Sequence, residues 1–432
     1  MSEQESTLNE FTDSDILESG KKWESVKLED IARKRSNNVD PEEVAIDRHI
    51  GLEHIQPNTP TPDWEPVDDL SSTKRRFEAG DILFAKLRPN LEKSAQPDFE
   101  GIASTDIFPI VATEGINSKY LLYQLSSKPA YDHARRTSVG TRMPRTSWNL
   151  FSNYEFQLPS VEEQHKIATV LYTVDQAIQK TEEIREKAKS VEEVAKTEFF
   201  THGYSEWDVQ ESVEWRCRAN QVPKDWDVKT ADELMEITRG ASPRPRSDDS
   251  LFGGNIPWIK IGDANRDESK RIEEVNSYVT EKGKNRSKFV EEGTLLVANS
   301  GATCGFSIFA GVDGCVHDGW LILRGYDDFS PDFLYHYINW NYDYLQSLSL
   351  GSAQTNLSTS LFGRLDIPVP ALQEQQQIVN ALDSISEVVA HASTEINRLQ
   401  RLKRGLMQDL LSGEIRTHDK DIDILDDVLQ HG

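Results

Sequence analysis

One group of residues in the chain has side-chain types that could bind a metal ion. Cys304, Cys315 and His317 lie close together in the second half of the chain. Their C-x10-C-x-H spacing fits no common zinc-ligand pattern, and isolated cysteines usually pack as small apolar core residues. We therefore predict that these three positions form no metal site.

A pair of carboxylates is the second candidate for chemistry. Asp81 and Asp106 could act together in a nuclease, but no acid–lysine set accompanies them, and roles in turns are the favoured interpretation. The chain also lacks a G-x-x-x-x-G-K-[ST] phosphate loop and the Asp/Asn-Pro-Pro-Tyr/Phe run expected of an adenine methyltransferase. The sequence therefore predicts a protein that is not an enzyme, and an enzyme with an unrecognised site is an alternative.

Basic, aromatic and amide side chains in the first half could bind the phosphates and base edges of DNA. The stretch from His133 to Tyr154 contains no acidic residue, so its arginines form a locally basic segment. A solvated loop with ordinary surface arginines is the alternative interpretation of this stretch. For Lys86 and Arg88 the alternative is salt bridges to Glu92 or Asp81. The candidate DNA-binding residues here are Lys86, Arg88, Arg135, Arg136, Arg142, Arg145, Trp148 and Asn149.

The second half offers a comparable set of candidates. In EKGKNRSK (281–288) the cations alternate, so a strand would place all of them on one face. Acids that follow ASPRPR (241–246) could neutralise its arginines, and the amides of GSAQTNLSTS could simply hold their loop. The candidates are Arg244, Arg246, Lys260, Lys282, Lys284, Arg286, Lys288, Gln354 and Asn356.

The overall charge of the chain argues against nucleic acid at first sight. The net charge is −25 and the pI is about 4.8, which indicates either a basic partner or a cytosol with molar salt. Few lysines and methionines beside many acids favour the second interpretation, a halophilic host. Three cysteines, an acidic N-terminus and no apolar run of about 18 residues predict a cytoplasmic protein without a membrane segment.

An internal repeat organises the chain. LPSVEEQHKIATVL (158–171) returns as VPALQEQQQIVNAL (369–382), and SVGTRMPRTSWNLFSNYEFQLP (138–159) aligns without a gap on SLGSAQTNLSTSLFGRLDIPVP (349–370). Further upstream, EAGDILFAKLRPN (78–90) resembles EEGTLLVANSGAT (291–303), and KKWESVKLEDIA (21–32) resembles KDWDVKTADELM (224–235). Several matches in one order indicate a chain built twice. Each half has short β-like runs and short helices, which predict a mixed α/β globule.

A long helix is predicted to close each half. Ser160 is the expected N-cap with Glu163 as its capping-box partner, and Gly413 is the expected C-cap of the second helix. Apolar residues alternate at spacings of three and four, as on a coiled-coil seam. A coiled coil between two chains is the alternative to two helices that pack within one chain. The predicted seam contains Ile167, Leu171, Val174, Ile178, Ile184, Val191, Ile378, Leu382, Ile385, Val389, Ile396, Leu399, Leu402, Leu406 and Leu410.

Motifs over residues 23 to about 416 resemble those of the specificity subunits of type I restriction–modification systems. They are GDILFAKLRPN and GIASTDIFPI in the first half, and IPWIKIGD, LLVANSGATCGFS and GSAQTNLSTSLFGRLDIPVP in the second. Both halves also have a P-x-x-x-E-Q-x-x-I helix start, and the second ends in LKRGLMQDLLSGEIR. The resemblance implies two target-recognition domains joined by two long antiparallel coiled-coil helices. Each domain would read one half of a split double-stranded DNA site, and the helices would set the spacer.

The resemblance also implies partners and cofactors. Two modification methyltransferase subunits would use S-adenosylmethionine, restriction (translocase) subunits would use ATP and Mg²⁺, and this chain would bind no cofactor. A free-standing DNA-binding or scaffolding protein that dimerises through a coiled coil is the alternative function. The predicted segments are an acidic tail (1–20), domain 1 (21–157), helix 1 (158–203), a linker (204–221), domain 2 (222–368), helix 2 (369–416) and an acidic tail (417–432).

Overall fold

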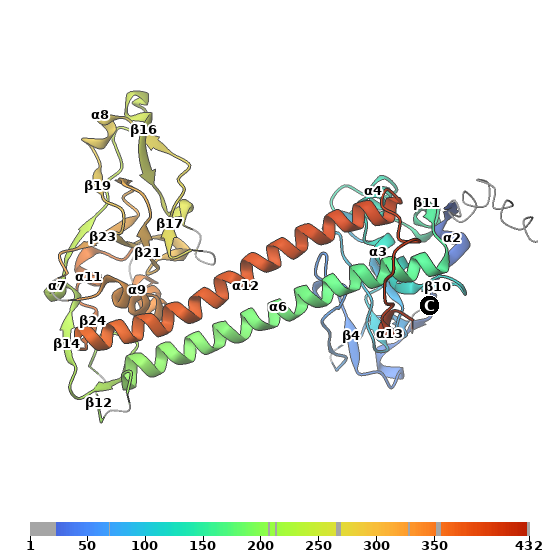
Figure 1. Cartoon of the computed structure of the whole chain (residues 1–432), viewed down its shortest axis with the longest axis horizontal. Helices are drawn as coiled ribbons and strands as arrows, with labels where there is room; N and C mark the ends of the chain where they lie inside the picture. The colour runs from blue at the N-terminus through green and yellow to red at the C-terminus, as the bar shows by residue number, and fades with distance from the viewer. Residues whose placement is uncertain are drawn as a thin grey trace, which may run out of the picture. The chain divides into compact units, whose positions relative to one another are not determined.

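The computed structural model describes residues 23–68, 70–205, 208–211, 214–264, 269–326, 329–350 and 356–429. The chain divides into two compact units: unit 1 (Met1–Lys180 and Asn397–Gly432) and unit 2 (Thr181–Ile396). The fold is mixed α/β, and two long helices, α6 (Val161–His202) and α12 (Leu372–Ser412), join the two globular domains (Figure 1). Each unit therefore contains one globular domain and one half of each long helix.

The domain of unit 1 contains two small sheets. The first has the order β2-β10-β7-β8: β2 (Ala32–Lys34), β10 (Ile107–Ala112), β7 (Ile82–Ala85) and β8 (Ser94–Ala95). The second has the order β3-β6-β9-β4-β5: β3 (Asn38–Val39), β6 (Lys74–Phe77), β9 (Gly101–Ala103), β4 (Arg48–Ile50) and β5 (Glu65–Pro66). A separate antiparallel pair joins β1 (Glu24–Lys27) to β11 (Glu155–Leu158). The α-helices are α2 (Leu28–Ile31), α3 (Ser118–Leu125), α4 (Lys128–Arg136), α5 (Trp148–Phe151) and α13 (Asp426–Leu429).

The domain of unit 2 repeats this plan with more strands. Its first sheet has the order β15-β23-β20-β21-β17: β15 (Glu236–Arg239), β23 (Trp320–Arg324), β20 (Leu295–Ala298), β21 (Ser307–Ala310) and β17 (Arg271–Ile272). Its second has the order β18-β16-β22-β19: β18 (Tyr278–Val279), β16 (Phe252–Ile259), β22 (Gly314–Val316) and β19 (Lys288–Val290). The pairs β14 (Asp227–Thr230) with β24 (Asp366–Val369) and β12 (Val209–Glu211) with β13 (Gln221–Pro223) complete it. The α-helices are α7 (Ala231–Leu234), α8 (Glu281–Lys284), α9 (Pro331–Trp340), α10 (Tyr342–Leu350) and α11 (Thr359–Phe362).

The four strands of the first sheet of unit 1, in the order β2-β10-β7-β8, match β15-β23-β20-β21 of unit 2, to which β17 is added. β10 pairs antiparallel with β7 and β2, as β23 pairs with β20 and β15. β7 in unit 1 and β20 in unit 2 are buried throughout, because their sequences, ILFA and LLVA, carry apolar side chains on both faces. The repeat in the sequence is therefore a repeat of one sheet and the helices that follow it.

The glutamate that opens each long helix binds a tryptophan from the start of its domain. In unit 1 the Trp23 indole Nε1 donates to Glu163 Oε2 at 2.9 Å, and in unit 2 Trp226 Nε1 donates to Glu374 Oε2 at 3.0 Å. The Glu163 backbone N–H donates to Ser160 Oγ at 3.4 Å, but the Glu163 carboxylate serves Trp23 and not the Ser160 backbone. The predicted capping box is thus only half right, since the buried indole provides the stronger partner.

The next residue, a glutamine, ties each helix to its domain. Gln164 Nε2 donates to the Pro159 carbonyl at 3.0 Å, and its Oε1 accepts from the Asn117 N–H at 2.9 Å. Gln375 makes the same two bonds, to the Pro370 carbonyl at 2.9 Å and from Ser330 N–H at 2.8 Å. Asn117 and Ser330, whose N–H groups donate to these glutamines, are the N-caps of α3 and α9. Each glutamine therefore fixes the start of its long helix against the helix that follows the first sheet.

The two long helices contact each other antiparallel within each unit. In unit 1 a buried ion pair joins Asp175 of α6 to Lys403 of α12. In unit 2 Ser386 Oγ of α12 donates to Glu192 Oε1 of α6 at 2.9 Å. A buried polar pair resists sliding of one helix along the other, since any slip leaves a desolvated group without a partner. α12 ends at Ser412, and Gly413 follows it at a φ of 76° as the predicted C-cap.

The predicted seam is correct near the domains and wrong in the middle of α6. Ile167, Leu171, Ile378, Leu382, Ile396 and Leu410 are buried. Val174, Ile178, Ile385, Val389, Leu399 and Leu406 are half-buried. Ile184 and Val191 are 54% and 55% exposed, whereas the half-buried residues are their neighbours Arg185 and Glu192; Leu402 is also 50% exposed. A straight helix with 3.6 residues per turn drifts from a 3.5-residue repeat, so the inward face moves on by one residue.

None of the helices in the described part of the chain combines the length and apolar character needed to cross a membrane.

Candidate nucleic-acid interface

Four basic side chains of unit 1 gather at one edge of its sheets. Lys34 ends β2, Arg75 lies on β6 and Lys86 follows β7. The ammonium groups of Lys34 and Lys86 lie 6.0 and 5.8 Å from the centre of the Phe108 ring. Arg145 reaches the same edge from the loop before α5, where it pairs with Asp106.

Asp106 holds this group of cations together. Arg145 donates to both of its carboxylate oxygens, at 2.9 and 3.0 Å, and Lys86 Nζ lies 3.6 Å away. The Arg145 hydrogen bonds lower the pKa of Asp106, so the carboxylate stays ionised. Asp81 has a different partner, Arg35, whose Nε donates to it at 2.7 Å. The two aspartates thus bind different arginines, Asp81 binding Arg35 and Asp106 binding Arg145.

The cations outweigh the acid at this edge. Burial lowers the pKa of Lys34 below 10.5, and the charges of Arg75 and Lys86 lower it further. Burial also lowers the pKa of Lys86; Asp106 acts in the opposite direction, while Arg75 and Arg145 add to the lowering. Arg75 Nε is buried, and no described residue accepts its hydrogen. A bound anion would relieve this repulsion, and a DNA phosphate is such an anion.

The other predicted residues of unit 1 differ in availability. Arg88, Arg136 and Arg142 are exposed, and no ion pair engages them within the described ranges. Arg135 is unavailable, because it pairs with Asp132 and with Glu92 at 3.0 Å. The alternative of a salt bridge to Glu92, considered for Lys86 and Arg88, therefore applies to Arg135 instead.

Trp148 and Asn149 lie at the start of α5. The Trp148 ring packs edge-on against Phe108, 5.8 Å between centroids, so it supports the core beneath the basic group. Asn149 is exposed, and its carbonyl accepts from the Asn153 side chain at 2.6 Å.

Unit 2 has a comparable group around His317 and Asp318, just before β23. Arg239 Nε donates to the Asp318 carbonyl at 2.8 Å, and Arg244 Nη2 lies 3.5 Å from the Asp318 carboxylate. Arg246 Nη2 lies 3.4 Å from His317 Nε2. Burial lowers the pKa of His317; Asp318 opposes this, and Arg246 contributes further lowering, so the imidazole is neutral at pH 7.

Lys260 belongs to the same group in unit 2. Its ammonium lies 4.3 Å from the centre of the Trp258 ring and donates to Ser277 Oγ at 2.6 Å. The Trp258 ring in turn lies 5.7 Å from the His317 ring. The equivalent sheet edges of the two units thus both carry several cations around a single carboxylate.

The interpretation of residues 281–288 as a strand is wrong. Residues 281–284 form α8, because Thr280 caps it by accepting from the Gly283 N–H at 3.2 Å, and only Lys288 begins a strand. A Cβ at Gly283 would come 2.2 Å from the Leu251 carbonyl oxygen, so this close helix approach needs glycine. The four cations consequently do not share one face.

Each of those cations has its own surroundings. Lys282 pairs with Asp248 at 3.2 Å, and Lys284 lies 4.3 Å from the centre of the Phe289 ring. Arg286 donates to the Arg244 carbonyl at 2.8 Å and so braces the loop of Arg244 and Arg246. Lys288 is exposed.

Gln354 lies outside the described residues, and Asn356 is the structural counterpart of Arg145. Arg145 forms an isolated β-bridge with Leu87, and Asn356 forms one with Ser300. Leu87 follows β7 and Ser300 follows β20, while Arg145 and Asn356 lie in the loops before α5 and α11. The two bridges therefore join equivalent segments in the two units.

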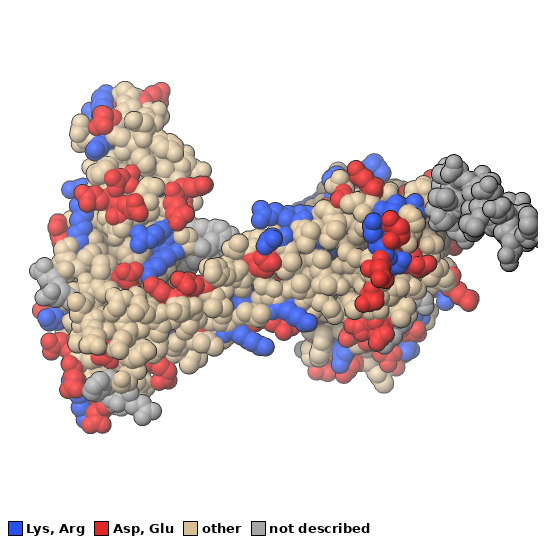
Figure 2. All heavy atoms as spheres, in the orientation of Figure 1, with Lys and Arg blue, Asp and Glu red and all other residues tan. Residues whose placement is uncertain are grey.

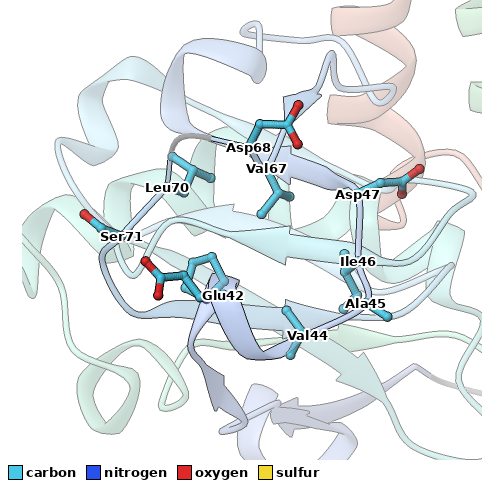
Figure 3. Close-up of a pocket in the computed structure, with 10 residues that line it drawn as sticks. Glu42, Val44, Ala45, Ile46, Asp47, Val67, Asp68, Leu70 and Ser71 are labelled. Carbon is cyan, nitrogen blue, oxygen red and sulfur yellow. The ribbon is translucent and has the colours of Figure 1, made fainter.

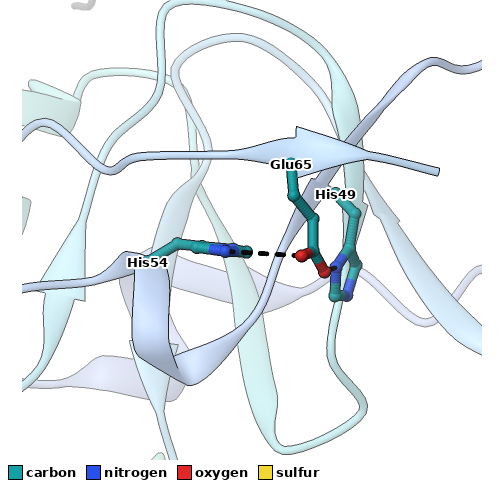
Figure 4. A group of neighbouring side chains, drawn as sticks. All are labelled: His49, His54 and Glu65. Carbon is teal, nitrogen blue, oxygen red and sulfur yellow. Dashed lines mark hydrogen bonds and ion pairs between the residues drawn. The ribbon is translucent and has the colours of Figure 1, made fainter.

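Among the described residues, Cys304, Cys315 and His317 do not come together as a cluster of possible metal ligands. Cys304 and Cys315 are fully buried and belong to different hydrophobic clusters. His49, His54 and Glu65 do lie together in unit 1, with His49 Nδ1 2.8 Å and His54 Nε2 3.8 Å from the carboxylate (Figure 4). The Gly51 N–H donates to His54 Nδ1 at 2.9 Å, so the ring proton is on Nε2 and that nitrogen has no lone pair for a metal. Glu65 instead clamps strand β5 to β4.

A cavity of about 800 Å³ lies elsewhere in unit 1, between the segments before β4 and after β5 (Figure 3). Its apolar wall includes Val44 and Val67, while Glu42, Asp47 and Asp68 carry the charge at its rim. These acids repel phosphate. Figure 2 shows acidic side chains spread widely over the visible face, with Lys and Arg in smaller groups.

Three basic residues at the candidate sites escaped the sequence-based prediction: Lys34, Arg75 and Arg239. Lys34 and Arg75 lie in the runs ARKR and TKRR, which are visible signals of positive charge. Outside these groups, Arg48 of β4 makes another contact that the sequence does not signal: its guanidinium lies 5.0 and 4.6 Å from the centres of the Trp64 and Phe99 rings. That contact depends on β4 and β5 lying side by side and has no counterpart in local sequence.

Two repeated α/β domains with a basic sheet edge, joined by a pair of long helices, define a class of DNA-recognition protein, and comparisons identify the family. Residues 20–190 and 223–401 match the type I restriction modification DNA specificity domain. The chain belongs to that family.

Named relatives and solved structures agree with this assignment. The type I restriction enzyme MjaVIII specificity subunit of Methanocaldococcus jannaschii is 25% identical over 312 residues, covering 69% of this chain and 70% of the relative. The HindI specificity subunit of Haemophilus influenzae is 21% identical and covers 81% and 90%. The type I system S subunit from M. genitalium has a similar fold, with a TM-score of 0.57 at 14% identity over 90% of this chain and 96% of that one. A structure described as the basis of complex assembly of the type I R-M system gives a TM-score of 0.54 at 20% identity, covering 91% and 99%.

Proposed function

We propose that this chain is the DNA specificity subunit of a type I restriction–modification complex. Each globular domain reads one half of a bipartite double-stranded target, and the long helices set the spacer between the halves. The observation that carries the proposal is the recurrence of one arrangement: cations around a single carboxylate at the same sheet edge, near Asp106 in unit 1 and near Asp318 in unit 2.

The chain acts in this proposal as a subunit without catalysis. Two methyltransferase subunits bring S-adenosylmethionine to adenines in the target, and restriction subunits bring ATP and Mg²⁺, all in the cytoplasm. Support comes from the family assignment and from the structural partners of the two candidate carboxylates, since Asp81 binds Arg35 while Asp106 binds Arg145. Each of these carboxylates is engaged by an arginine, which supports a structural role for both.

Methylome sequencing tests the proposal. In the source organism we expect a split motif with methyladenine in both halves, and its complete loss when this gene is deleted. Complementation with the intact gene restores it. A deletion strain that keeps every methylated motif would contradict the proposed function.

A binding measurement tests the subunit's dependence on its partners. The chain carries a net charge of −25, which repels DNA at low salt. At about 1 M salt the Debye length is only ~3 Å, so the repulsion fades together with the phosphate contacts. We therefore expect weak binding by the chain alone and specific binding in the presence of the methyltransferase. Nanomolar specific binding by the isolated chain would argue for a free-standing DNA-binding protein.

A further inference from the structure

A loop beside the Asp106 group of unit 1 is held firmly by its own backbone. Val139 and Arg145 exchange both backbone hydrogen bonds, at 2.9 and 3.1 Å, and this single antiparallel bridge closes a short hairpin-like loop, here called the ribbon. Gly140 turns the chain with a φ of 102°, a conformation that favours glycine. Arg88 N–H donates to the Pro144 carbonyl at 2.7 Å, and Arg145 is anchored on Asp106. The position of the tip (residues 140–143) is therefore set by contacts on both sides.

The loop exposes apolar side chains where a surface loop is ordinarily polar. Val139 is 75% exposed and Met143 is 45% exposed. Thr141 and Arg142 between them are also exposed, and within the described part of the chain no ion pair engages Arg142. A single exposed apolar residue needs no explanation, but two on one rigid ribbon beside an unpaired arginine indicate a contact surface.

The charges around the ribbon indicate the chemical class of its partner. Arg88 and Arg136 are exposed beside it, and Lys86 lies behind it with Asp106 already engaged by Arg145. The stretch from His133 to Tyr154 contributes no acid. In a chain with a net charge of −25, this combination fits a polyanion that also presents apolar groups.

Duplex DNA offers such groups in its major groove, as the C5-methyl groups of thymine. The major groove is wide enough for a two-stranded β-ribbon, and the minor groove is not. We propose that the Val139–Arg145 ribbon enters the major groove of one half-site, where Val139 and Met143 contact thymine methyl groups. Arg142 binds the adjacent phosphate or base edge. This inference rests on the proposed function and adds the apolar part of base recognition to it.

The test replaces each thymine of the cognate half-site with deoxyuridine, which keeps base pairing but lacks the methyl group. Binding is measured with the complex of this chain and its methyltransferase subunits, on the target found by methylome sequencing. Loss of one buried methyl contact corresponds to about a 4-fold weakening. We expect this loss at one or two thymines of one half-site and none in the other half-site.

A variant links the methyl groups to the ribbon. Met143→Gln keeps the side-chain length and Val139→Thr keeps the branched shape, so the double variant retains the loop while making its tip polar. It should bind thymine and deoxyuridine duplexes equally. Leu150→Gln is the matched control, because Leu150 is 44% exposed but lies on α5 outside the ribbon; its thymine preference should equal that of the wild type.

Two results would overturn the inference: equal binding of every thymine and deoxyuridine duplex by the wild-type complex, or an unchanged preference in the double variant. Retained preference for the other bases of the same half-site shows that unit 1 of the variant is folded. A wild-type complex that does not distinguish target from random duplex overturns the proposed function itself, and this inference with it.

Discussion

Glu163 of unit 1 provides a prediction whose size follows from its contacts. Its two carboxylate oxygens accept four hydrogen bonds: from Trp23 Nε1 at 2.9 Å, from Arg416 Nε and Nη2 at 2.9 Å each, and from Thr417 N–H at 3.0 Å. Burial alone would raise the pKa of this carboxyl, but the hydrogen bonds from Arg416, Trp23 and Thr417 lower it from 4.5 to about 2. The carboxylate is only 2% exposed, so water and salt screen it weakly.

The lowered pKa of Glu163 makes unit 1 sensitive to acid. Because the folded pKa lies below the unfolded value, the stabilisation is fully present above pH 4.5 and is lost as the pH falls toward 2. Each tenfold change in proton affinity is worth about 1.4 kcal/mol, so the contribution at neutral pH is roughly 3 kcal/mol. Glu163→Gln removes the charge and leaves one oxygen for four donors. We expect a loss of stability of roughly that size at pH 7.

The repeat offers a matched control for this substitution. Glu374 of unit 2 accepts from Trp226 Nε1 and from Tyr204 N–H, both at 3.0 Å, and the structure gives it no arginine partner among the described residues. Glu374→Gln should therefore cost about 1 kcal/mol, the value of a neutral hydrogen bond. The difference between the two variants isolates the Arg416 charge.

Hydrogen exchange read by mass spectrometry suits the measurement, because peptides report on each unit separately. We expect Glu163→Gln to lower protection in unit 1 at pH 7 and to converge with the wild type as the pH falls toward 2. Equal losses in the Glu163 and Glu374 variants, or a pH-independent gap, would refute the assigned role of the Arg416 ion pair.

Three further predictions concern DNA. Burial and neighbouring cations lower the pKa of Lys34 and Lys86 below 10.5, and a bound phosphate favours their charged forms. The affinity of the complex for DNA should therefore fall as the pH rises through these lowered pKa values. Lys34→Met should make this fall shallower in a fluorescence-anisotropy titration. Arg142→Ala should weaken binding by about 1–3 kcal/mol if Arg142 contacts a base, with relaxed base preference at one position. Arg145→Ala should in addition release the ribbon from Asp106. Unchanged methylation of the target in both variants would show that this loop is not part of the interface. Four residues inserted after Glu183 extend α6 by roughly 6 Å. The spacer of the target should then grow by one or two base pairs at ~3.4 Å each, while both half-sites stay the same. A methylome with altered half-site bases and the old spacer would contradict a spacer set by the helices.

The sequence was informative wherever a local pattern has a local cause. The two helix starts were predicted because the same residues recur, and the structure shows the cause: each Glu–Gln pair binds a tryptophan and a helix cap. The seam in the middle of α6 was mispredicted, since a choice between Ile184 and Arg185 depends on helix pitch accumulated over several turns. Alternating cations at 281–288 suggested a strand, but the Thr280 cap and the close approach at Gly283 decide for a helix.

Site prediction was limited by contacts between residues distant in the chain. Arg142 and Arg145 look alike in sequence, yet β-pairing of distant segments brings Asp106 to Arg145 alone. In the same way Arg135 is neutralised by Glu92, which lies in a separate loop. A basic run therefore marks a surface, while the tertiary fold determines which of its cations stay available.

The single carboxylate in each basic group explains how the candidate interface can be both ordered and positively charged. Without Asp106, the like charges of Arg75, Lys86 and Arg145 would repel one another and the ribbon would lose its anchor. With several carboxylates, the group would be neutral and would gain little from phosphate. One acid among several cations is enough to position Arg145 but leaves a net positive charge, which the phosphates of bound DNA neutralise. Asp318 has a comparable place in unit 2, where its carboxylate lies 3.5 Å from Arg244 Nη2 and its backbone carbonyl accepts from Arg239. Removing the acid should then have a two-sided effect: Asp106→Asn increases the positive charge, and so strengthens binding to random DNA, while it loosens the ribbon and weakens discrimination of the target. A ratio of specific to random affinity that stays constant in this variant would show that Asp106 sets charge alone and not position.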